Sequence, residues 1–285
     1  MINDSLIYDV GAHIGEDTEF YLKKGFHVVA IEAVPELCGA LNDKFSESVA
    51  SGRLKILNLA VSKSAGVVDF YVDDKISVWG TTNWEWVKRN RALGAGNVRK
   101  ISVGAERLSD IMKEYGVPRY CKIDIEGNDL EALATLESLD EKPRFVSIES
   151  EKREWYGLLK EFEVFEHLGY SKYKVVDQSF VRLQKCPTPP SEGSFQPHTF
   201  EEGSSGLFGN ELPGRWLNLF EALEAYRNIF RGYALGGDNG IFHDRLSFFS
   251  LIGRVQELSM RMRGNEGYRL VQLPPAGWYD THAAR

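Results

Sequence analysis

The sequence has few cysteines, no long apolar run and no excess of positive charge. Its three cysteines are odd in number and show no close pairing, so neither a disulfide framework nor a zinc cluster is expected. No apolar stretch approaches the length of a membrane span. The formal net charge of −7 weighs against a broad nucleic-acid surface, which relies on clustered Lys and Arg. The sequence therefore favours a protein that binds neither membranes nor nucleic acid.

A recognisable signal peptide is also missing, because the first strand-like run begins within a few residues of Met1. A reducing, cytoplasmic location is the resulting expectation. The apolar content of 43% and the charged content of 26% are typical of a globular protein. At 285 residues the chain can form one sizeable core with an elaboration, or two small domains.

Short apolar runs alternate with helical patterns along much of the chain. Strands are predicted at residues 6–10, 27–31, 54–60, 119–125, 145–149, 173–176 and 278–282. Alternation of this kind is typical of a parallel sheet with helices on both faces. The sequence therefore predicts an α/β fold with a doubly wound, mostly parallel seven-stranded sheet and a C-terminal elaboration of helices and loops.

Composition changes at Cys186, and half of the ten prolines lie between Pro187 and Pro213. This stretch is interpreted as a loop or lid. Apolar residues at helical spacing then predict two helices, near residues 216–230 and 249–262, which would cap a pocket or form a dimer interface. The predicted domains are a core at 1–186, a lid or helical elaboration at 187–270, and a return to the sheet at 271–285.

An excursion interrupts the alternation between Gly66 and Gly104. It contains a predicted added strand at 67–72 and an aromatic segment at 79–86. The tryptophans there either anchor the core of the excursion or line a substrate pocket over the carboxyl edge of the sheet. The basic stretch at 88–91 is interpreted as a solvated helix face.

A glycine turn follows the first predicted strand. Gly11 and Gly15 allow a sharp turn and a close approach of the backbone to a ligand. Glu32 follows about twenty residues later, at the end of the second strand, where a carboxylate can accept hydrogen bonds from both hydroxyls of a ribose. His13 stands where a dinucleotide fingerprint requires glycine, and Asp9 would repel a pyrophosphate. The turn therefore suits a nucleoside cofactor with a cationic amino-acid end.

Six segments carry a wider resemblance: DVGAHIGEDT (9–18), VVAIEAVPELCGAL (28–41), LNLAVS (57–62), CKIDIEGNDLEAL (121–133), VSIES (146–150) and GWYDTHA (277–283). Together they resemble the FkbM family of class I S-adenosylmethionine-dependent methyltransferases. The run from Lys122 to Gly127 is the most specific of these segments. The resemblance covers most of the first 180 residues and implies S-adenosyl-L-methionine as the cofactor.

By this resemblance, the first turn would face the methionine part of the cofactor, Glu32 the ribose, and the segment from Asn58 to Ala60 the adenine edge. Thr18 is a further candidate contact, and the alternative for it is the buried face of the first helix. The predicted cofactor-binding residues are Asp9, Gly11, His13, Gly15, Thr18, Glu32, Ala33, Asn58, Ala60 and Asp124.

The predicted catalytic residues are Asp124, Glu149 and His282. Asp124 and Glu126 share one side of their strand, and so do Glu149 and Glu151. Such carboxylates could hold Mg²⁺, although the sequence does not favour a metal. The alternative for Glu126 is a cap on the following helix. His282 could act as a base near neutral pH.

The leading hypothesis is an S-adenosylmethionine-dependent O-methyltransferase whose acceptor is a hydroxyl of a sugar or secondary metabolite. The acceptor class follows from the resemblance alone. The expected partner is a small-molecule or glycan acceptor, and a homo-oligomer is a further option. The alternatives are a nicotinamide-dependent Rossmann oxidoreductase and a non-catalytic binding module on the same fold.

Overall fold

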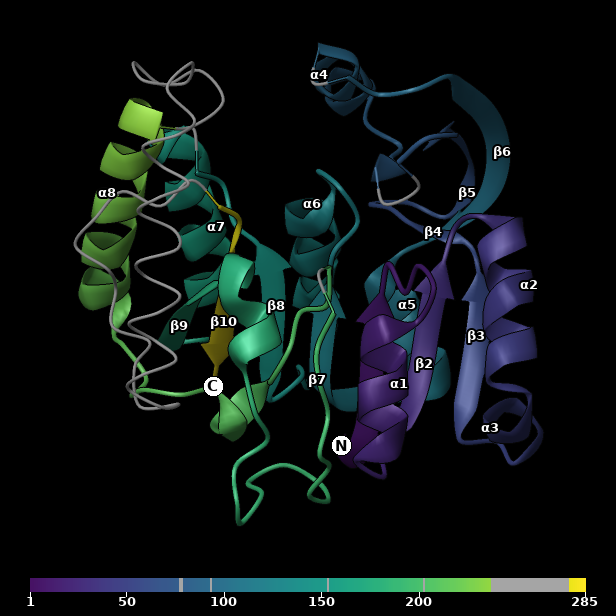
Figure 1. The fold of residues 1–285 in the computed structure, drawn as a ribbon, viewed down its shortest axis with the longest axis horizontal. Coiled ribbons are helices and arrows are strands. Elements are labelled where there is room, and N and C mark those ends of the chain that lie inside the picture. Colours follow the sequence, from purple (N-terminus) through teal and green to yellow (C-terminus); the bar gives the residue numbers. More distant parts are fainter. Residues whose placement is uncertain (77–78, 93, 153, 202, 237–276) are drawn as a thin grey trace. The chain divides into compact units, whose positions relative to one another are not determined.

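The computed structural model describes residues 1–76, 79–92, 94–152, 154–201, 203–236 and 277–285 (Figure 1). The chain divides into two compact units, Met1–Ile148 (unit 1) and Glu149–Arg285 (unit 2). The helix predicted near 249–262 lies outside the described residues. Within the described ranges, no helix combines the length and the apolar character that crossing a membrane requires.

A seven-stranded sheet has the order β3-β2-β1-β7-β8-β10-β9. Its strands are β1 (Ile2–Val10), β2 (His27–Glu32), β3 (Leu54–Asn58), β7 (Val117–Ile123), β8 (Phe145–Glu149), β9 (Lys172–Asp177) and β10 (Tyr279–Ala284). The first five strands pair in parallel, whereas β10 runs antiparallel to β9. The predicted doubly wound, mostly parallel sheet is confirmed.

The strand order reverses at β1, which lies between β2 and β7. Val10 at the end of β1 is in register with Ile31 of β2 and with Ile123 of β7. The carboxyl ends of these three strands therefore meet at one edge of the sheet. In open α/β sheets this reversal point is where ligands bind.

Short amphipathic helices accompany the strands of unit 1. They are α1 (Glu16–Lys23), α2 (Pro35–Lys44), α3 (Ser46–Ala50), α5 (Leu108–Tyr115), α6 (Asp129–Ala134) and the 3₁₀ turn η2 (Thr135–Ser138). Acidic residues occupy the first turn of α1 and Lys23 the last, which matches the helix dipole. Pro35 begins α2, where its missing N–H costs nothing.

The core of unit 1 forms around β1 and β7, whose central residues are almost fully buried. Tyr120 on β7 packs edge-on against Tyr21 of α1, with ring centroids 5.9 Å apart. The Tyr120 hydroxyl forms a 2.7 Å hydrogen bond with the hydroxyl of Ser147 on β8. The hydroxyls of Tyr120 and Ser147 thus satisfy each other inside the core.

The predicted excursion contributes to a second, three-stranded sheet of order β4-β6-β5. Figure 1 shows these strands and helix α4. The elements are β4 (Ala60–Val61), β5 (Gly66–Asp73), α4 (Trp84–Ala92) and β6 (Val98–Glu106). One face of this sheet packs against Ala33 and Val34, which follow β2. The sequence predicted β5 and a helix face at 88–91, which lies within α4, but it did not predict β6. It also joined β3 to β4 in one strand, although they belong to different sheets. In Figure 1 this sheet and α4 lie beyond the carboxyl ends of β2 and β3.

Unit 2 contains α7 (Trp155–His167), two 3₁₀ turns, η3 (Gln178–Leu183) and η4 (Gly209–Glu211), and α8 (Leu219–Gly236). Helix α8 buries Ala222, Ala225, Tyr226 and Ile229, which repeat at helical spacing. The Tyr226 hydroxyl bonds to the hydroxyl of Thr281 on β10 at 2.6 Å. The predicted domain boundaries and the lid role of the proline-rich segment stay predictions.

Candidate functional site

The turn between β1 and α1 lies against the end of β7. Gly11 has a φ of 83°, and a Cβ at this residue would lie 1.9 Å from the carbonyl oxygen of Asp124. The Gly11 N–H donates to the carbonyl of Ile31 at 2.9 Å. Gly15 has a φ of 80°, and a Cβ there would lie 2.7 Å from the side chain of Leu41. Only glycine fits at the two ends of this turn, because both positions require a positive φ and leave no space for a side chain.

The substitution Gly11→Ala is expected to lower the free energy of unfolding by at least about 2 kcal/mol, because a left-handed residue with a Cβ costs roughly 1–2 kcal/mol before the collision with Asp124 is added. Urea denaturation at pH 7 measures the change. Gly39 provides the control, since it is exposed within α2 and has open space around it. Gly39→Ala should stabilise the protein by roughly 0.5–1 kcal/mol. Equal effects of the two substitutions would contradict this account of the turn.

Glu32 ends β2 with its carboxylate between two backbone amides. Its Oε2 accepts a hydrogen bond from the His13 N–H at 2.9 Å, and its Oε1 accepts one from the Val34 N–H at 2.8 Å. Burial raises the pKa of Glu32. Each carboxylate oxygen has two lone pairs, so each can accept one further hydrogen bond. Glu32 therefore keeps an acceptor pair for two neighbouring hydroxyls.

Lys122 on β7 is surrounded by three carboxylates. Its Nζ lies 3.2 Å from Asp9, 3.4 Å from Asp17 and 3.7 Å from Asp124. It also donates to the carbonyl oxygen of Gly11 at 3.3 Å. Burial alone would lower the pKa of Lys122, but the carboxylates outweigh burial and raise this pKa well above its ordinary value. Three carboxylates around one ammonium form a cluster with an excess of acidic groups, which suits a cationic ligand.

Asp9 and Thr18 lie beneath the turn. The Thr18 hydroxyl donates to Asp9 Oδ2 at 2.6 Å, and both residues are completely buried. This bond fixes α1 against β1. The structure thus supports the packing alternative for Thr18, while direct contact of either residue with a cofactor stays a prediction.

Asn58 forms hydrogen bonds to the main chain at the end of β2. Its Nδ2 donates to the carbonyl oxygens of Glu32 at 3.1 Å and of Ala33 at 3.0 Å. Ala33 and Ala60 are both buried, in the core beneath the second sheet. His13 has a φ of 48°, and its Nδ1 lies 3.5 Å from the Glu16 carboxylate. These predicted cofactor residues gather around the carboxyl ends of β2 and β3, and their contact with adenine or ribose stays a prediction.

The loop after β7, residues 124–128, is ordered by Asp129. The Asp129 carboxylate accepts hydrogen bonds from the N–H groups of Ile125 at 3.1 Å and Gly127 at 3.2 Å. Glu126 adopts a φ of 53°, a conformation that a residue with a Cβ rarely takes. Asp129 thus orders the turn before α6, where the sequence had suggested Glu126.

The excursion forms hydrogen bonds to the same loop, residues 124–128. The Thr81 hydroxyl donates to the Glu126 carbonyl at 2.7 Å, and the Asn128 amide donates to the Thr82 hydroxyl at 2.8 Å. A Cβ on Gly127 would lie 2.2 Å from Nε1 of Trp86. The aromatic segment therefore lies against the loop that begins with Asp124. Whether it lines a substrate pocket stays a prediction.

Glu149 and His282 belong to unit 2. The Glu149 carboxylate, at the end of β8, accepts a hydrogen bond from Lys152 Nζ at 2.7 Å. His282 lies within β10 in register with Lys174 of β9, and it is 1% exposed. Burial and the charge of Lys174 lower the pKa of His282 to about 3. A base with so low a pKa accepts a proton weakly near neutral pH.

Acidification is expected to destabilise the protein through His282. Between pH 6.5 and about 3, the unfolded chain binds a proton at this side chain and the folded chain does not, so stability falls as the pH falls. The expected loss of unfolding free energy from pH 7 to pH 5 is about 2 kcal/mol. Urea denaturation at both pH values should show a smaller loss in His282→Gln. The exposed His27→Gln is the control, and an unchanged loss in His282→Gln would contradict the expectation.

Among the described residues, no group of three or more His, Cys, Asp or Glu side chains is placed to hold a metal ion. The carboxylates near the end of β8 bind their own chain. Glu149 pairs with Lys152, and Glu151 Oε1 accepts the N–H groups of Lys152 at 2.8 Å and Glu154 at 3.3 Å. Whether carboxylates at these strand ends hold Mg²⁺ stays a prediction.

A sequence profile of the methyltransferase FkbM domain matches residues 9–172, which is more than half of the chain. The chain belongs to the FkbM methyltransferase family. The match runs from Asp9, at the end of β1, to Lys172, at the start of β9. It includes Glu32, Lys122 and the whole second sheet.

Several solved methyltransferase structures are similar to this FkbM methyltransferase at low identity. Precorrin-6y C5,15-methyltransferase from Geobacter metallireducens is 13% identical, with a TM-score of 0.35, and the match covers 62% of this chain and 69% of that chain. Human methyltransferase 10 domain containing protein is 12% identical, with a TM-score of 0.36 and coverages of 61% and 66%. The METTL16 methyltransferase domain is 13% identical, with a TM-score of 0.36 and coverages of 61% and 54%, so about half of that chain is matched. No curated protein matches the sequence.

Membership of the FkbM family implies S-adenosylmethionine as the methyl donor, and the residues at the strand reversal fit it. Gly11 leaves the turn free of a side chain. Glu32 keeps acceptors for hydroxyls, and the carboxylates around Lys122 exceed its single charge. S-adenosylmethionine presents ribose hydroxyls and, with its sulfonium, ammonium and carboxylate, a net positive charge, so its chemistry complements both features.

Lys122 and Asp17 belong to this FkbM methyltransferase site, and the sequence analysis selected neither. Lys122 could have been found. Its signal is its position in the short buried run from Tyr120 to Ile123, two residues before Asp124. Side chains two apart share a face of a strand, and a lysine in a buried strand requires acidic partners. Those two rules together pair Lys122 with Asp124 and with an acid on a neighbouring strand.

Proposed function

We propose that this FkbM methyltransferase transfers a methyl group from S-adenosylmethionine to a hydroxyl oxygen of a sugar or secondary metabolite. The observation that supports this most strongly is the position of Asp124. Its side chain is 39% exposed, whereas the other carboxylates around Lys122 are buried. Asp124 thus lies near Lys122 and at the start of the loop that the excursion contacts.

S-adenosylmethionine supplies a methyl group bonded to a positively charged sulfur. Glu32 would accept hydrogen bonds from its ribose hydroxyls, and the main chain from Gly11 to Gly15 would lie along its methionine end. Asp9 and Asp17 place more negative charge below this turn than Lys122 balances. Because the sulfur becomes neutral once the methyl group has left, this excess favours the donor over the demethylated product.

In this proposal Asp124 is the general base that takes the proton from the hydroxyl of the methyl acceptor. The Lys122 ammonium, 3.7 Å away, and the loop ordered by Asp129 fix its position. Glu149 is 22% exposed and paired with Lys152, and His282 is buried with a lowered pKa. Of the three predicted catalytic residues, Asp124 has the exposure and the location that the role requires.

Titration calorimetry with S-adenosylhomocysteine and with NAD tests the cofactor assignment. Binding of S-adenosylhomocysteine without binding of NAD is expected. Incorporation of a labelled methyl group into neutral sugars and hydroxylated small molecules then tests the acceptor class. Failure of wild-type protein to bind S-adenosylhomocysteine would overturn the proposal.

Asp124→Asn is expected to lower the rate of methyl incorporation about 100-fold, the lower range for loss of a general base. Binding of S-adenosylhomocysteine should change less than tenfold, because Glu32 and the glycine turn stay intact. Asp140→Asn makes the same charge change in an exposed turn and should leave the rate unchanged. A normal rate in Asp124→Asn would remove Asp124 from the mechanism.

A further inference from the structure

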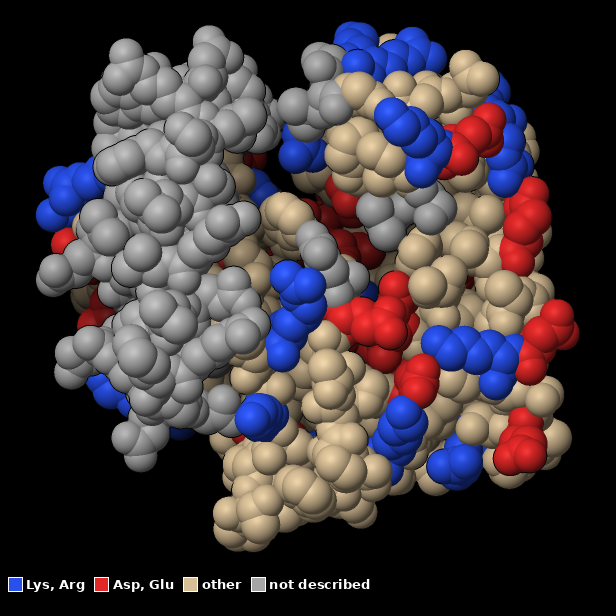
Figure 2. All heavy atoms as spheres, in the orientation of Figure 1, with Lys and Arg blue, Asp and Glu red and all other residues tan. Residues whose placement is uncertain are grey.

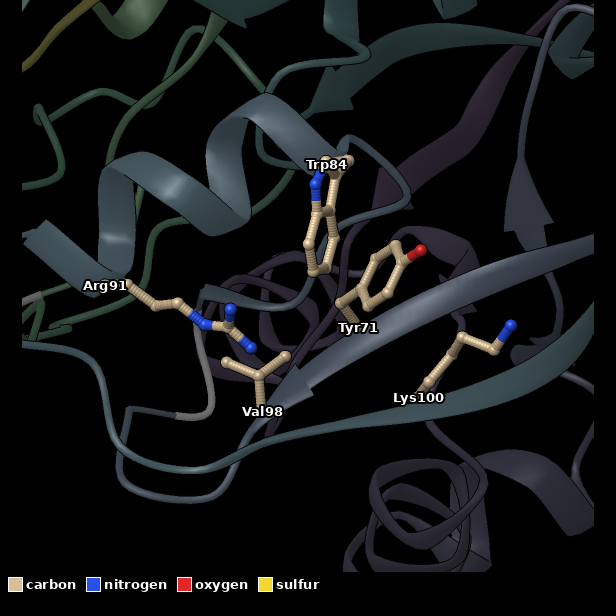
Figure 3. Close-up of a pocket in the computed structure, with 5 residues that line it drawn as sticks. All are labelled: Tyr71, Trp84, Arg91, Val98 and Lys100. Carbon is tan, nitrogen blue, oxygen red and sulfur yellow. The ribbon is translucent and has the colours of Figure 1, made fainter.

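A groove on the second sheet has no part in the proposed methyl transfer (Figure 3). Its volume is about 490 Å³, within the usual range for small-ligand sites. It is lined by Tyr71 of β5, Trp84 and Arg91 of α4, and Val98 and Lys100 of β6. Tyr71 is the cross-strand partner of Lys100, so both stand on the same face of the sheet. The neighbouring residues Phe70 and Val72 point to the opposite face, into the core.

The aromatic wall of the groove consists of the rings of Tyr71 and Trp84. The rings of Tyr71 and Trp84 have centroids 4.9 Å apart and planes inclined by 52°. Because the two rings are close and inclined, a planar nucleobase cannot stack between them. Trp84 is 42% exposed, so part of its indole is accessible to a ligand. The apolar C–H face of a sugar ring can cover such a surface.

Two cations, Arg91 and Lys100, line the polar wall of the groove, and Asp69 pairs with Lys100 next to it. The guanidinium of Arg91 lies 5.4 Å from the centroid of the Trp84 ring, and no carboxylate in the described part of the chain pairs with it. Lys100 forms a 2.9 Å ion pair with Asp69. Figure 3 shows Arg91 and Lys100 on opposite sides of the two rings. Arg91 can therefore bind an anionic group, while Lys100 and Asp69 can donate to and accept from hydroxyls.

Helix α4 separates this groove from the loop after β7. Trp84 and Arg91 are seven residues apart and share one helix face. Trp86 and Arg89 share another face, where Arg89 stacks on the Trp86 ring at 4.4 Å and Trp86 contacts Gly127. Figure 2 shows Lys and Arg side chains gathered over α4. The groove is thus a distinct basic and aromatic site on the same helix that holds the loop.

We infer that this groove binds an anionic carbohydrate. The sugar ring lies on Trp84, its carboxylate or phosphate pairs with Arg91, and its hydroxyls bond to Lys100 and Asp69. The inclined rings and the protein's net charge of −7 disfavour a nucleotide. This inference goes beyond the proposed methyl transfer and does not depend on it, because binding is measured without a methyl donor.

Calorimetry on the full chain at low ionic strength tests the inference with five probes: glucuronate, glucose 1-phosphate, methyl glucoside, inorganic phosphate and AMP. At least one of the two sugar anions is expected to bind ten-fold or more tightly than methyl glucoside, inorganic phosphate or AMP. The stronger of the two identifies the anionic group. Binding of neither sugar anion, or equal or stronger binding of any of the other three probes, overturns the inference.

Variants locate the site. Arg91→Gln is expected to weaken binding of the sugar anion at least ten-fold, and Trp84→Ala to weaken it by a similar factor. Arg99→Gln is the matched control, because Arg99 stands on the opposite face of β6 and pairs with Glu36 at 3.0 Å. Circular dichroism checks that each variant is folded. Unchanged binding in Arg91→Gln overturns the inference, as does an equal loss in Arg99→Gln.

Discussion

Replacing Glu32 by alanine is expected to raise the dissociation constant for S-adenosylhomocysteine about 1,000-fold. The carboxylate would lose two charge-assisted hydrogen bonds to ribose hydroxyls, each worth roughly 1.5–3 kcal/mol, and about 4 kcal/mol in total corresponds to three powers of ten. The same change leaves the N–H groups of His13 and Val34 without their acceptor. Titration calorimetry at pH 7 measures the dissociation constant.

Two further variants separate the loss of ribose contacts from a general loss of structure. Glu36→Ala removes an exposed carboxylate four residues later in sequence, on α2, and should leave binding unchanged. Glu32→Gln keeps the shape and one acceptor oxygen, so its effect should lie between those of wild type and Glu32→Ala. Binding within three-fold of wild type in Glu32→Ala would exclude Glu32 from the donor site.

Replacing Lys122 by methionine is expected to lower the free energy of unfolding by about 4 kcal/mol. Methionine matches the length of the lysine chain but leaves the buried carboxylates of Asp9 and Asp17 without their cation. Removal of one member of a buried ion pair typically costs about 3–5 kcal/mol, because the remaining charge stays desolvated. Urea denaturation at pH 7 gives the difference from wild type.

A second substitution shows whether charge is the cause. Asp9→Asn in the Lys122→Met background removes one of the uncompensated charges and should recover at least about 1 kcal/mol. Lys113→Met breaks only an exposed pair with Asp110 and should cause no resolvable change. A loss below about 1 kcal/mol in Lys122→Met would show that the cluster is not electrostatically coupled.

Much of the large sheet could be predicted because β2, β8 and the second half of β1 are apolar runs that end in turn residues or carboxylates. The second sheet was harder to predict. In β6, two charged residues, Arg99 and Lys100, follow each other in sequence. Only one face of the strand is buried, so its apolar signal is weak. The single residue Leu59 separates β3 from β4, and sequence alone does not show that the chain changes sheet there.

The candidate site was predictable in location but not in the roles of its residues. Asp9 in β1 and Thr18 in α1 flank the glycine turn, yet their complete burial depends on how α1 packs. His282 looked like a base because histidine titrates near neutral pH. Its strand, however, lies between β8 and β9 in the sheet, and all six residues of β10 are buried. Burial of this kind is a tertiary property that local spacing does not report.

The ion pair between Lys122 and Asp9 joins residues 113 positions apart, which has a consequence for how the protein acquires activity during synthesis. The glycine turn and Glu32 leave the ribosome long before β7 does. Closing so long a loop costs entropy that only the complete β1–β7 pairing repays. A nascent chain that ends before residue 117 contains Asp9 and Asp17 but not Lys122, so the ion pairs of this cluster form only after β7 has emerged.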